Sequence, residues 1–230
     1  MSKEKRNPRR ASPTYAVRAP LARWLRAEAE RAGRDLGRLR VLDVGSGPKP
    51  YEPFFAPWAH AYVGVDLADA DLVGTVEELP VEDGSFDVVL CNQVLEHCSD
   101  PAQAVRELRR ATAPGGRVLA STHGAQVYHP APEDLWRWTH AGLERLFAAN
   151  GDWSSLDVRP GSGTAACVGM LLGTFTHLLA KRLGAPAAAR PLVAALNLAG
   201  EALDRRIPSL REPRPGTIFA NYHVVAEVPR

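Results

Sequence analysis

An aspartate and two glycines follow an apolar run near the first fifth of the chain. The strand-like run Leu39–Val44 ends in Asp43-Val44, and Gly45-Ser46-Gly47 follow directly. Glycines let the backbone approach a ligand more closely than side chains would allow, and a carboxylate at a strand end accepts hydrogen bonds from a hydroxyl or cationic group. Taken alone, these residues also fit a tight turn that binds nothing. The segment is a candidate ligand-binding turn that needs a second feature beside it.

A second carboxylate follows where such a turn requires one. Asp66 ends the apolar run 61–65, about twenty residues past the turn, where a carboxylate can bind both hydroxyls of a ribose. The two features together predict a nucleoside-bearing ligand. A dinucleotide-binding turn would have a third glycine, and Pro50 stands at that position.

Three histidines follow the later strand-like runs. His97, His123 and His129 lie in or after segments expected as loops at the carboxyl ends of strands. An imidazole there can act as a general base, although a structural or surface histidine is the alternative for each. We prefer His97 and His123 as catalytic residues and place His129 on the substrate side. Trp136 and Trp138 join it there, either stacking on an acceptor or packing at the start of a helix.

The elements that must position these residues alternate between strand and helix patterns. Strands are predicted at 39–44, 61–66, 85–92, 117–122, 156–159 and 218–228, with a weaker one at 72–76, and helices at 20–34, 101–111 and 140–150. Asp100 and Thr139 are expected N-caps, with Gln103 completing a capping box. This alternation predicts an α/β fold: a doubly wound, mostly parallel seven-stranded sheet with helices on both faces. Ligands of such sheets bind at the carboxyl ends of the strands.

Five sequence blocks together resemble the signature segments of a known family. They are Val41–Gly47, Gly64–Asp66, Glu78–Pro80 with Asp83–Val89, Val94–His97 and Leu108–Gly116. In this order they resemble class I S-adenosylmethionine-dependent methyltransferases, most of all the small-molecule branch called methyltransferase type 11. The resemblance spans about residues 39–150. It implies a Rossmann-like fold, S-adenosylmethionine as cofactor, and in-line methyl transfer to oxygen or nitrogen of a small-molecule or sugar/lipid-linked acceptor.

The resemblance also implies a role for each matching position. The implied contacts are Asp43, Gly45, Ser46 and Gly47 around the methionine portion and the sulfonium, Asp66 and Leu67 at the ribose, Thr75 and Val76 beside the adenine, and Asn92 and Gln93 closing over the cofactor. Two positions depart from the family pattern. Many relatives carry an aspartate where Thr75 stands, and Pro48-Lys49-Pro50 stiffens a loop that often keeps a third glycine.

The regions outside the resemblance set the expected domain organisation. We expect a disordered basic tail over 1–15, a methyltransferase core over 16–159, a helical insertion over 160–215 and a closing strand within 216–230. The insertion is largely apolar, but glycine, threonine and His177 dilute it too much for a membrane span. Two helices forming a lid, an acceptor-binding surface or a homodimer surface are favoured, with lipid contact through 165–206 as an alternative.

The composition limits the remaining function classes. A formal net charge of +2 does not indicate a nucleic-acid partner, and 45% hydrophobic with 23% charged residues is typical of a folded enzyme. The three cysteines lack CxxC spacing, and no metal is expected. Without a secretory signal pattern, the expected location is cytoplasmic. The alternatives are a noncatalytic cofactor-binding or interaction protein of the same fold and a nucleotide-dependent oxidoreductase.

Overall fold

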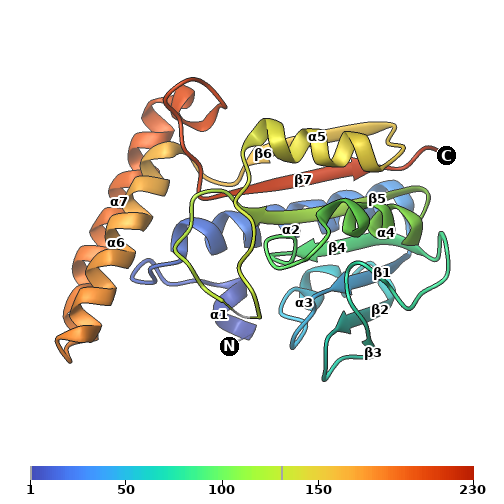
Figure 1. Cartoon of the computed structure of the whole chain (residues 1–230), viewed down its shortest axis with the longest axis horizontal. Helices are drawn as coiled ribbons and strands as arrows, with labels where there is room; N and C mark the ends of the chain where they lie inside the picture. The colour runs from blue at the N-terminus through green and yellow to red at the C-terminus, as the bar shows by residue number, and fades with distance from the viewer. Residues whose placement is uncertain (1, 131) are drawn as a thin grey trace.

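The computed structural model describes residues 2–130 and 132–230, and a mixed sheet forms its centre (Figure 1). The seven strands are β1 (Leu39–Val44), β2 (Ala59–Asp66), β3 (Leu72–Val73), β4 (Phe86–Asn92), β5 (Thr112–His123), β6 (Ser155–Pro160) and β7 (Asn221–Glu227), in the order β3-β2-β1-β4-β5-β7-β6. β1 to β5 pair in parallel, whereas β7 is antiparallel to β5 and β6. The predicted fold class is confirmed, with the weak third strand reduced to two residues.

Helices cover both faces of the sheet because both faces of its central strands are apolar. On one face α4 (Pro101–Ala111) and α5 (His140–Asn150) bury Leu108 and Phe147 against Leu42 and Val89. On the other face α2 (Tyr15–Leu36) and α3 (Glu52–Phe55) pack on the opposite sides of the same strands. Alternate residues of each central strand therefore serve two separate cores, as expected for a strand buried on both sides.

The predicted caps of α4 and α5 are present, but the capping box is not. Asp100 Oδ1 accepts a 3.0 Å hydrogen bond from Gln103 N, and Thr139 Oγ1 accepts one of 3.1 Å from Gly142 N. The Gln103 amide does not reach back to Asp100 and instead donates to the carbonyl of Glu77 at 3.2 Å. The capping-box prediction was wrong because the Glu77 carboxylate, brought in by the preceding loop, lies 3.5 Å from Asp100 N as an alternative acceptor.

The helical insertion forms a hairpin between β6 and β7. It consists of α6 (Thr164–Arg182), the short 3₁₀ helix η1 (Pro186–Ala189), α7 (Arg190–Arg206) and a second 3₁₀ helix η2 (Pro208–Arg211). Figure 1 shows α6 and α7 side by side, extending past the edge of the α/β core. By length and composition alone α6 is able to cross a membrane, but its first half packs on α2 through Ala166, Cys167 and Met170.

The N-terminal segment differs from the disordered tail expected for 1–15. Residues Ser2–Arg6 form α1, and Arg6 Nη1 donates a 2.7 Å hydrogen bond to the Pro50 carbonyl. Further along, the buried Asn197 of α7 donates to the carbonyls of Arg10 and Ser12 at 2.7 and 3.1 Å. Because a buried amide needs partners, it binds this segment to the hairpin, a contact that no local sequence pattern signals.

Candidate functional site

The candidate site lies at the carboxyl ends of the parallel strands, as the sequence predicts. The register pairs Asp43 of β1 with Gly64 of β2, and Asn92 of β4 with Ser121 of β5. The strand ends that carry Asp43, Asp66 and Asn92 are therefore neighbours along one edge of the sheet. β3 adds only a short edge beside β2, so the Thr75–Val76 loop after it closes this end of the site.

The glycine turn after β1 adopts backbone geometry that only glycine tolerates easily. Gly45 and Gly47 have φ of +69° and +48°, and a Cβ at Gly45 would lie 2.3 Å from Val94 Cγ2. Gly47 N donates a 2.8 Å hydrogen bond to Asp66 Oδ2, while Leu67 N donates to Asp66 Oδ1 at 2.8 Å. Backbone groups thus orient the Asp66 carboxylate, whose remaining lone pairs can accept ribose hydroxyls.

Asp43 lies deeper, almost fully buried beneath the turn. Its Oδ2 accepts a 2.7 Å hydrogen bond from the Tyr62 hydroxyl of β2. Burial raises the pKa of Asp43 to about 7, and the Tyr62 hydrogen bond opposes that rise. Sequence reasoning missed Tyr62, because a tyrosine within a strand gives no sign of which carboxylate its hydroxyl meets.

Two adjoining cavities divide the predicted site residues. We call them the Asp66 cavity, of about 350 Å³, and the Asp43 cavity, of about 320 Å³. The Asp66 cavity is lined by Asp66, Leu67, Thr75, Val76 and His97, and the Asp43 cavity by Asp43, Ser46, Asn92, His123 and His129. Gly45 and Gln93 line both. A ligand that extends past Gly45 and Gln93 can occupy the two cavities together.

The structure separates the two preferred catalytic histidines. His97 lines the Asp66 cavity beside Thr75 and Val76, whereas His123 lines the Asp43 cavity. His129 lies between them, with ring centroids 5.2 Å from His97 and 5.0 Å from His123. His97 and His123 therefore line different cavities, and a catalytic role for either one stays a prediction.

Trp136 and Trp138 line neither cavity. Their indoles stack on each other with centroids 5.6 Å apart, Trp136 Nε1 donates to the Cys98 carbonyl at 2.8 Å, and Trp138 packs on the core beneath α4 and α5. Packing, the alternative considered from the sequence, accounts for their contacts.

The Asp43 cavity includes residues that sequence reasoning missed. Lys5 of α1 and Arg18 of α2 bring basic groups to its wall, together with Tyr51 and Gln126. Burial lowers the pKa of Lys5, an effect opposed by the nearby carboxylates of Asp43 and Asp66. The basic run at the N-terminus predicts a solvated tail, and only the long-range packing of α1 shows that one of its residues faces the site.

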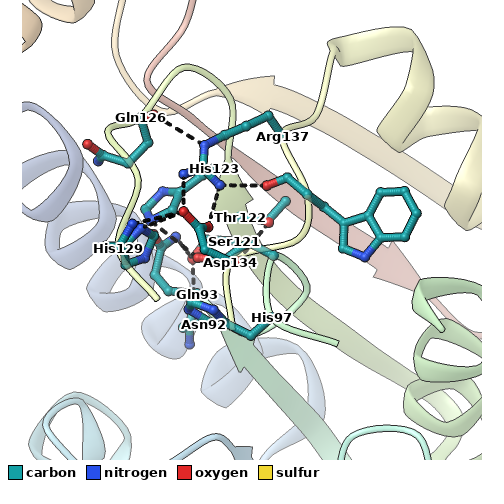
Figure 2. A network of polar contacts seen from close by, with 12 residues as sticks. Asn92, Gln93, His97, Ser121, Thr122, His123, Gln126, His129, Asp134 and Arg137 are labelled. Atoms are coloured by element: carbon teal, nitrogen blue, oxygen red, sulfur yellow. Dashed lines mark hydrogen bonds and ion pairs between the residues drawn. The ribbon is translucent and has the colours of Figure 1, made fainter. Parts of the chain in front are cut away.

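A polar network holds the strand ends together (Figure 2). Ser121 Oγ donates to Asn92 Oδ1 at 3.1 Å and accepts from Gln93 Nε2 at 3.0 Å. Asn92 Nδ2 and Gln93 Oε1 are buried and have no hydrogen-bond partner among the residues that the structure describes. Unpartnered buried polar atoms are costly and call for an explanation. Both side chains line the Asp43 cavity, so a polar ligand there would satisfy them, and these residues fit the implied cofactor.

His123 and Glu96 form the buried end of the same region. His123 Nε2 lies 3.3 Å from Glu96 Oε1, and Thr122 Oγ1 donates a 2.8 Å hydrogen bond to Glu96 Oε2. Burial lowers the pKa of His123 to about 3 and raises the pKa of Glu96 to about 7. A histidine with so low a pKa is neutral at pH 7 and accepts a proton weakly, which disfavours the general-base role predicted for it.

Comparisons with known proteins identify the family of this chain. A family model described as a methyltransferase domain matches residues 14–155. Malonyl-[acyl-carrier protein] O-methyltransferase from Erwinia pyrifoliae is 36% identical over 126 residues, which cover 49% of this chain and 48% of that protein. The chain thus spans about half the length of this relative.

Solved structures share the fold at low sequence identity. A 1,6-didemethyltoxoflavin N1-methyltransferase from Burkholderia thailandensis, solved with S-adenosylhomocysteine, matches with a TM-score of 0.54 and 16% identity over 90% of this chain and 78% of its own. The [4+2]-cyclase SpnF matches with a TM-score of 0.57 and 18% identity over 90% of this chain and 82% of its own. These matches support the fold alone.

Proposed function

Because this chain belongs to the methyltransferase-domain family, we propose that it transfers a methyl group from S-adenosylmethionine to an oxygen or nitrogen of a small-molecule or sugar/lipid-linked acceptor. The observation that carries this function is the junction of the two cavities at Gly45 and Gln93. A cofactor in the Asp66 cavity would have its reactive end at that junction, beside a second cavity open to an acceptor.

The residues of the Asp66 cavity would hold the nucleoside half of the cofactor. Asp66, oriented by Gly47 N and Leu67 N, accepts the ribose hydroxyls, and Thr75 and Val76 lie beside the adenine. In the Asp43 cavity, the Asp43 carboxylate favours a cationic group, and Asn92 Nδ2 with Gln93 Oε1 gain partners. Nine of the ten cofactor positions expected from the sequence line one of the two cavities, and the tenth, Gly47, orients Asp66 through its N–H.

The chemistry depends on placement more than on proton transfer. Bound S-adenosylmethionine supplies a methyl group on a sulfonium, which is already activated for displacement. The acceptor atom would form a bond to the methyl carbon while the carbon–sulfur bond breaks with its electron pair kept by sulfur, and the proton of a hydroxyl or amine acceptor would pass to solvent. His123, His129 and Gln126 orient the acceptor, while α1 and α2 exclude water on the opposite side.

Calorimetry tests the cofactor part of this proposal. We expect S-adenosylhomocysteine to bind the full chain and Asp66→Ala to weaken binding by about 10–100-fold, since two ribose hydrogen bonds are lost. Glu82→Ala, which removes an exposed carboxylate outside both cavities, is the matched control. Unchanged binding by Asp66→Ala would overturn the assignment, and tight NADH binding would favour the oxidoreductase alternative.

A second candidate is a cofactor-binding protein that does not methylate. The resemblance of the fold to a [4+2]-cyclase gives this alternative a specific basis, because one architecture carries more than one chemistry. Incubation of the protein with methyl-labelled S-adenosylmethionine and a metabolite extract separates the two. Label in an extract compound identifies a methyl acceptor, whereas cofactor binding without label transfer favours the alternative.

We further propose that the far end of the hairpin contacts a lipid surface. Phe175, Leu179 and Leu183 are 67%, 49% and 74% exposed, and the stretch 161–200 has no acidic residue. Lys181, Arg182 and Arg190 lie among these apolar side chains at the tip. An apolar surface with only positive charges suits an anionic membrane better than a second copy of itself, whose charges would repel.

Vesicle co-sedimentation tests the lipid contact. We expect binding to vesicles that contain anionic lipid, weaker binding to neutral vesicles, and loss of binding in Phe175→Ser/Leu183→Ser. Analytical ultracentrifugation of the same variants addresses the alternative, since a dimer broken by these substitutions without vesicle binding would show a homodimer surface. The predicted cytoplasmic location is compatible with either outcome and stays a prediction.

A further inference from the structure

Three side chains from two strand ends and a loop converge behind the acceptor side of the Asp43 cavity. Glu96, His123 and His129 each offer a carboxylate oxygen or ring nitrogen within 4.8 Å of the other two. Glu96 follows β4, His123 ends β5, and His129 lies in the loop beyond it. Figure 2 shows His123 and His129 within the same polar network.

Glu96 is oriented but only half satisfied. Thr122 Oγ1 donates to Glu96 Oε2, while the fully buried Oε1 accepts no hydrogen bond within 2–130 and 132–230 and has the His123 Nε2 atom 3.3 Å away. His123 Nδ1 is also buried and without a partner in that range. A buried carboxylate oxygen with no donor is expensive. The oxygen therefore lies where a positively charged ligand would satisfy it.

We propose that Glu96, His123 and His129 bind a divalent transition-metal cation. Two imidazoles and one carboxylate form a ligand set typical of zinc, cobalt and ferrous iron, whereas magnesium prefers oxygen ligands alone. His123 and His129 also line the Asp43 cavity, so the open coordination positions of the cation face the space assigned to the acceptor.

A rival arrangement uses His97, His129 and Asp134, which also lie within 4.8 Å of one another. Both Asp134 oxygens already accept hydrogen bonds of 2.6 Å from Arg137, and Oδ2 accepts a third from His129 N at 2.9 Å. The guanidinium would repel a cation there. Asp134 Oδ2 lies 3.5 Å from His129 Nδ1, so Asp134 acts as an outer partner that orients His129.

The acceptor-side role of the cation rests on the proposed function, but metal binding itself does not. A cation at this point binds an oxygen of the acceptor and favours ionisation of its hydroxyl, whose proton passes to solvent. The acceptors that suit this arrangement carry a hydroxyl or a vicinal oxygen pair.

Cobalt spectroscopy tests the site without relying on turnover. The full chain, treated with a chelator and then titrated with Co²⁺, is expected to develop visible absorption bands of a four- or five-coordinate ion at about one equivalent, which Zn²⁺ removes. Glu96→Gln and His129→Ala are expected to weaken Co²⁺ binding more than about 100-fold, because even outer partners cost 10–100-fold. His177→Ala, on the distant α6, is the matched control and should bind normally.

The outcomes distinguish the proposed metal site from the rival arrangement and from the proposed function. No cobalt bands, equal binding by Glu96→Gln and wild type, or loss in His97→Ala and Asp134→Asn with Glu96→Gln intact would each overturn it. S-adenosylhomocysteine calorimetry on the same samples reports folding, and His129→Ala guards against a misfolded Glu96→Gln because His129 is only half-buried. Cofactor binding without cobalt binding would overturn the metal site alone. Cobalt binding without cofactor binding would overturn the proposed function alone.

Discussion

The Tyr62 hydroxyl donates a 2.7 Å hydrogen bond to Asp43 Oδ2, joining β2 to β1 directly beneath the glycine turn. Because the hydrogen bond favours the ionised carboxylate, it partly offsets the burial that raises the pKa of Asp43 to about 7. The charge of Asp43 therefore changes within the physiological pH range, at the wall of the Asp43 cavity.

Tyr62→Phe should shift the pH dependence of cofactor binding upward. Removing the hydrogen bond raises the pKa of Asp43 above 7, so the carboxylate forms only at higher pH. Affinity for S-adenosylhomocysteine, measured by calorimetry from pH 6 to 9, should rise with pH in both proteins, with a later rise in the variant. Tyr128→Phe, which alters an exposed ring, is the control and should follow wild type. Identical profiles for Tyr62→Phe and wild type would refute the coupling.

Asp43→Asn should weaken cofactor binding and leave the Tm at pH 8 unchanged or higher. A carboxyl whose folded-state pKa exceeds its unfolded value contributes stability fully below about pH 4, and the contribution is lost as the pH rises through about 7. At pH 8 the ionised Asp43 therefore costs stability, which the amide avoids. Thermal unfolding at pH 8 should show an unchanged or higher Tm for the variant together with weaker cofactor binding. A lower Tm that persists at pH 5 would indicate that packing, and not charge, dominates at this position.

Gly45→Ala should destabilise the fold through two separable effects. A non-glycine residue at φ of +69° costs about 1–2 kcal/mol, and the added Cβ would also meet Val94 Cγ2 at 2.3 Å. Gly216→Ala is the matched control, because Gly216 has φ of +85° and a Cβ added there would meet nothing within 4 Å. The Tm should fall further for Gly45→Ala than for Gly216→Ala, by about 2–4 °C per kcal/mol.

Val94→Ala combined with Gly45→Ala separates those effects. The double variant relieves the contact with Val94 but keeps the unfavourable φ. The decrease in its Tm relative to Val94→Ala alone should therefore approach the decrease seen for Gly216→Ala. Additive losses would show that the turn moves away from Val94 without cost.

Asp204→Ala should loosen the hairpin without altering the sheet. Asp204 of α7 accepts hydrogen bonds from Ala165 N at 3.0 Å and Ala166 N at 3.1 Å, capping α6 from a neighbouring helix. Loss of such a cap costs about 1–2 kcal/mol. Hydrogen exchange should accelerate at the start of α6, with a smaller effect in Asp204→Asn, which keeps one acceptor oxygen. Uniform acceleration across β1 and β4 would contradict a local role.

The sequence predicted the core of the fold because the information there is local. Short apolar runs ending at Asp43, Asp66 and Asn92 indicate parallel strands buried on both faces, and Asp100 and Thr139 indicate helix starts through caps that the structure contains. The cofactor residues were implied by the family resemblance of these segments, and their contacts stay a prediction. The carboxyl ends of adjacent parallel strands lie side by side, so the residues at those ends are neighbours whatever side chains the strands carry.

The side of the site around the Asp43 cavity and the histidines could not be predicted from local patterns. Lys5 lines the Asp43 cavity because α1 binds back on the loop at Pro50, and His97 and His123 line different cavities because they follow different strands. The local sequence patterns did not indicate the proposed metal site, because Glu96, His123 and His129 meet only after β4 and β5 pair.

What the sequence by itself determined is the α/β framework and the residues along its carboxyl edge, because strand periodicity, glycine turns and caps act over a few residues. Only the tertiary structure decided which cavity each histidine lines, that Tyr62 meets Asp43, and that the hairpin holds the N-terminal segment through Asn197. These contacts join residues up to 187 positions apart, and their energies depend on burial and distance, which no local pattern encodes.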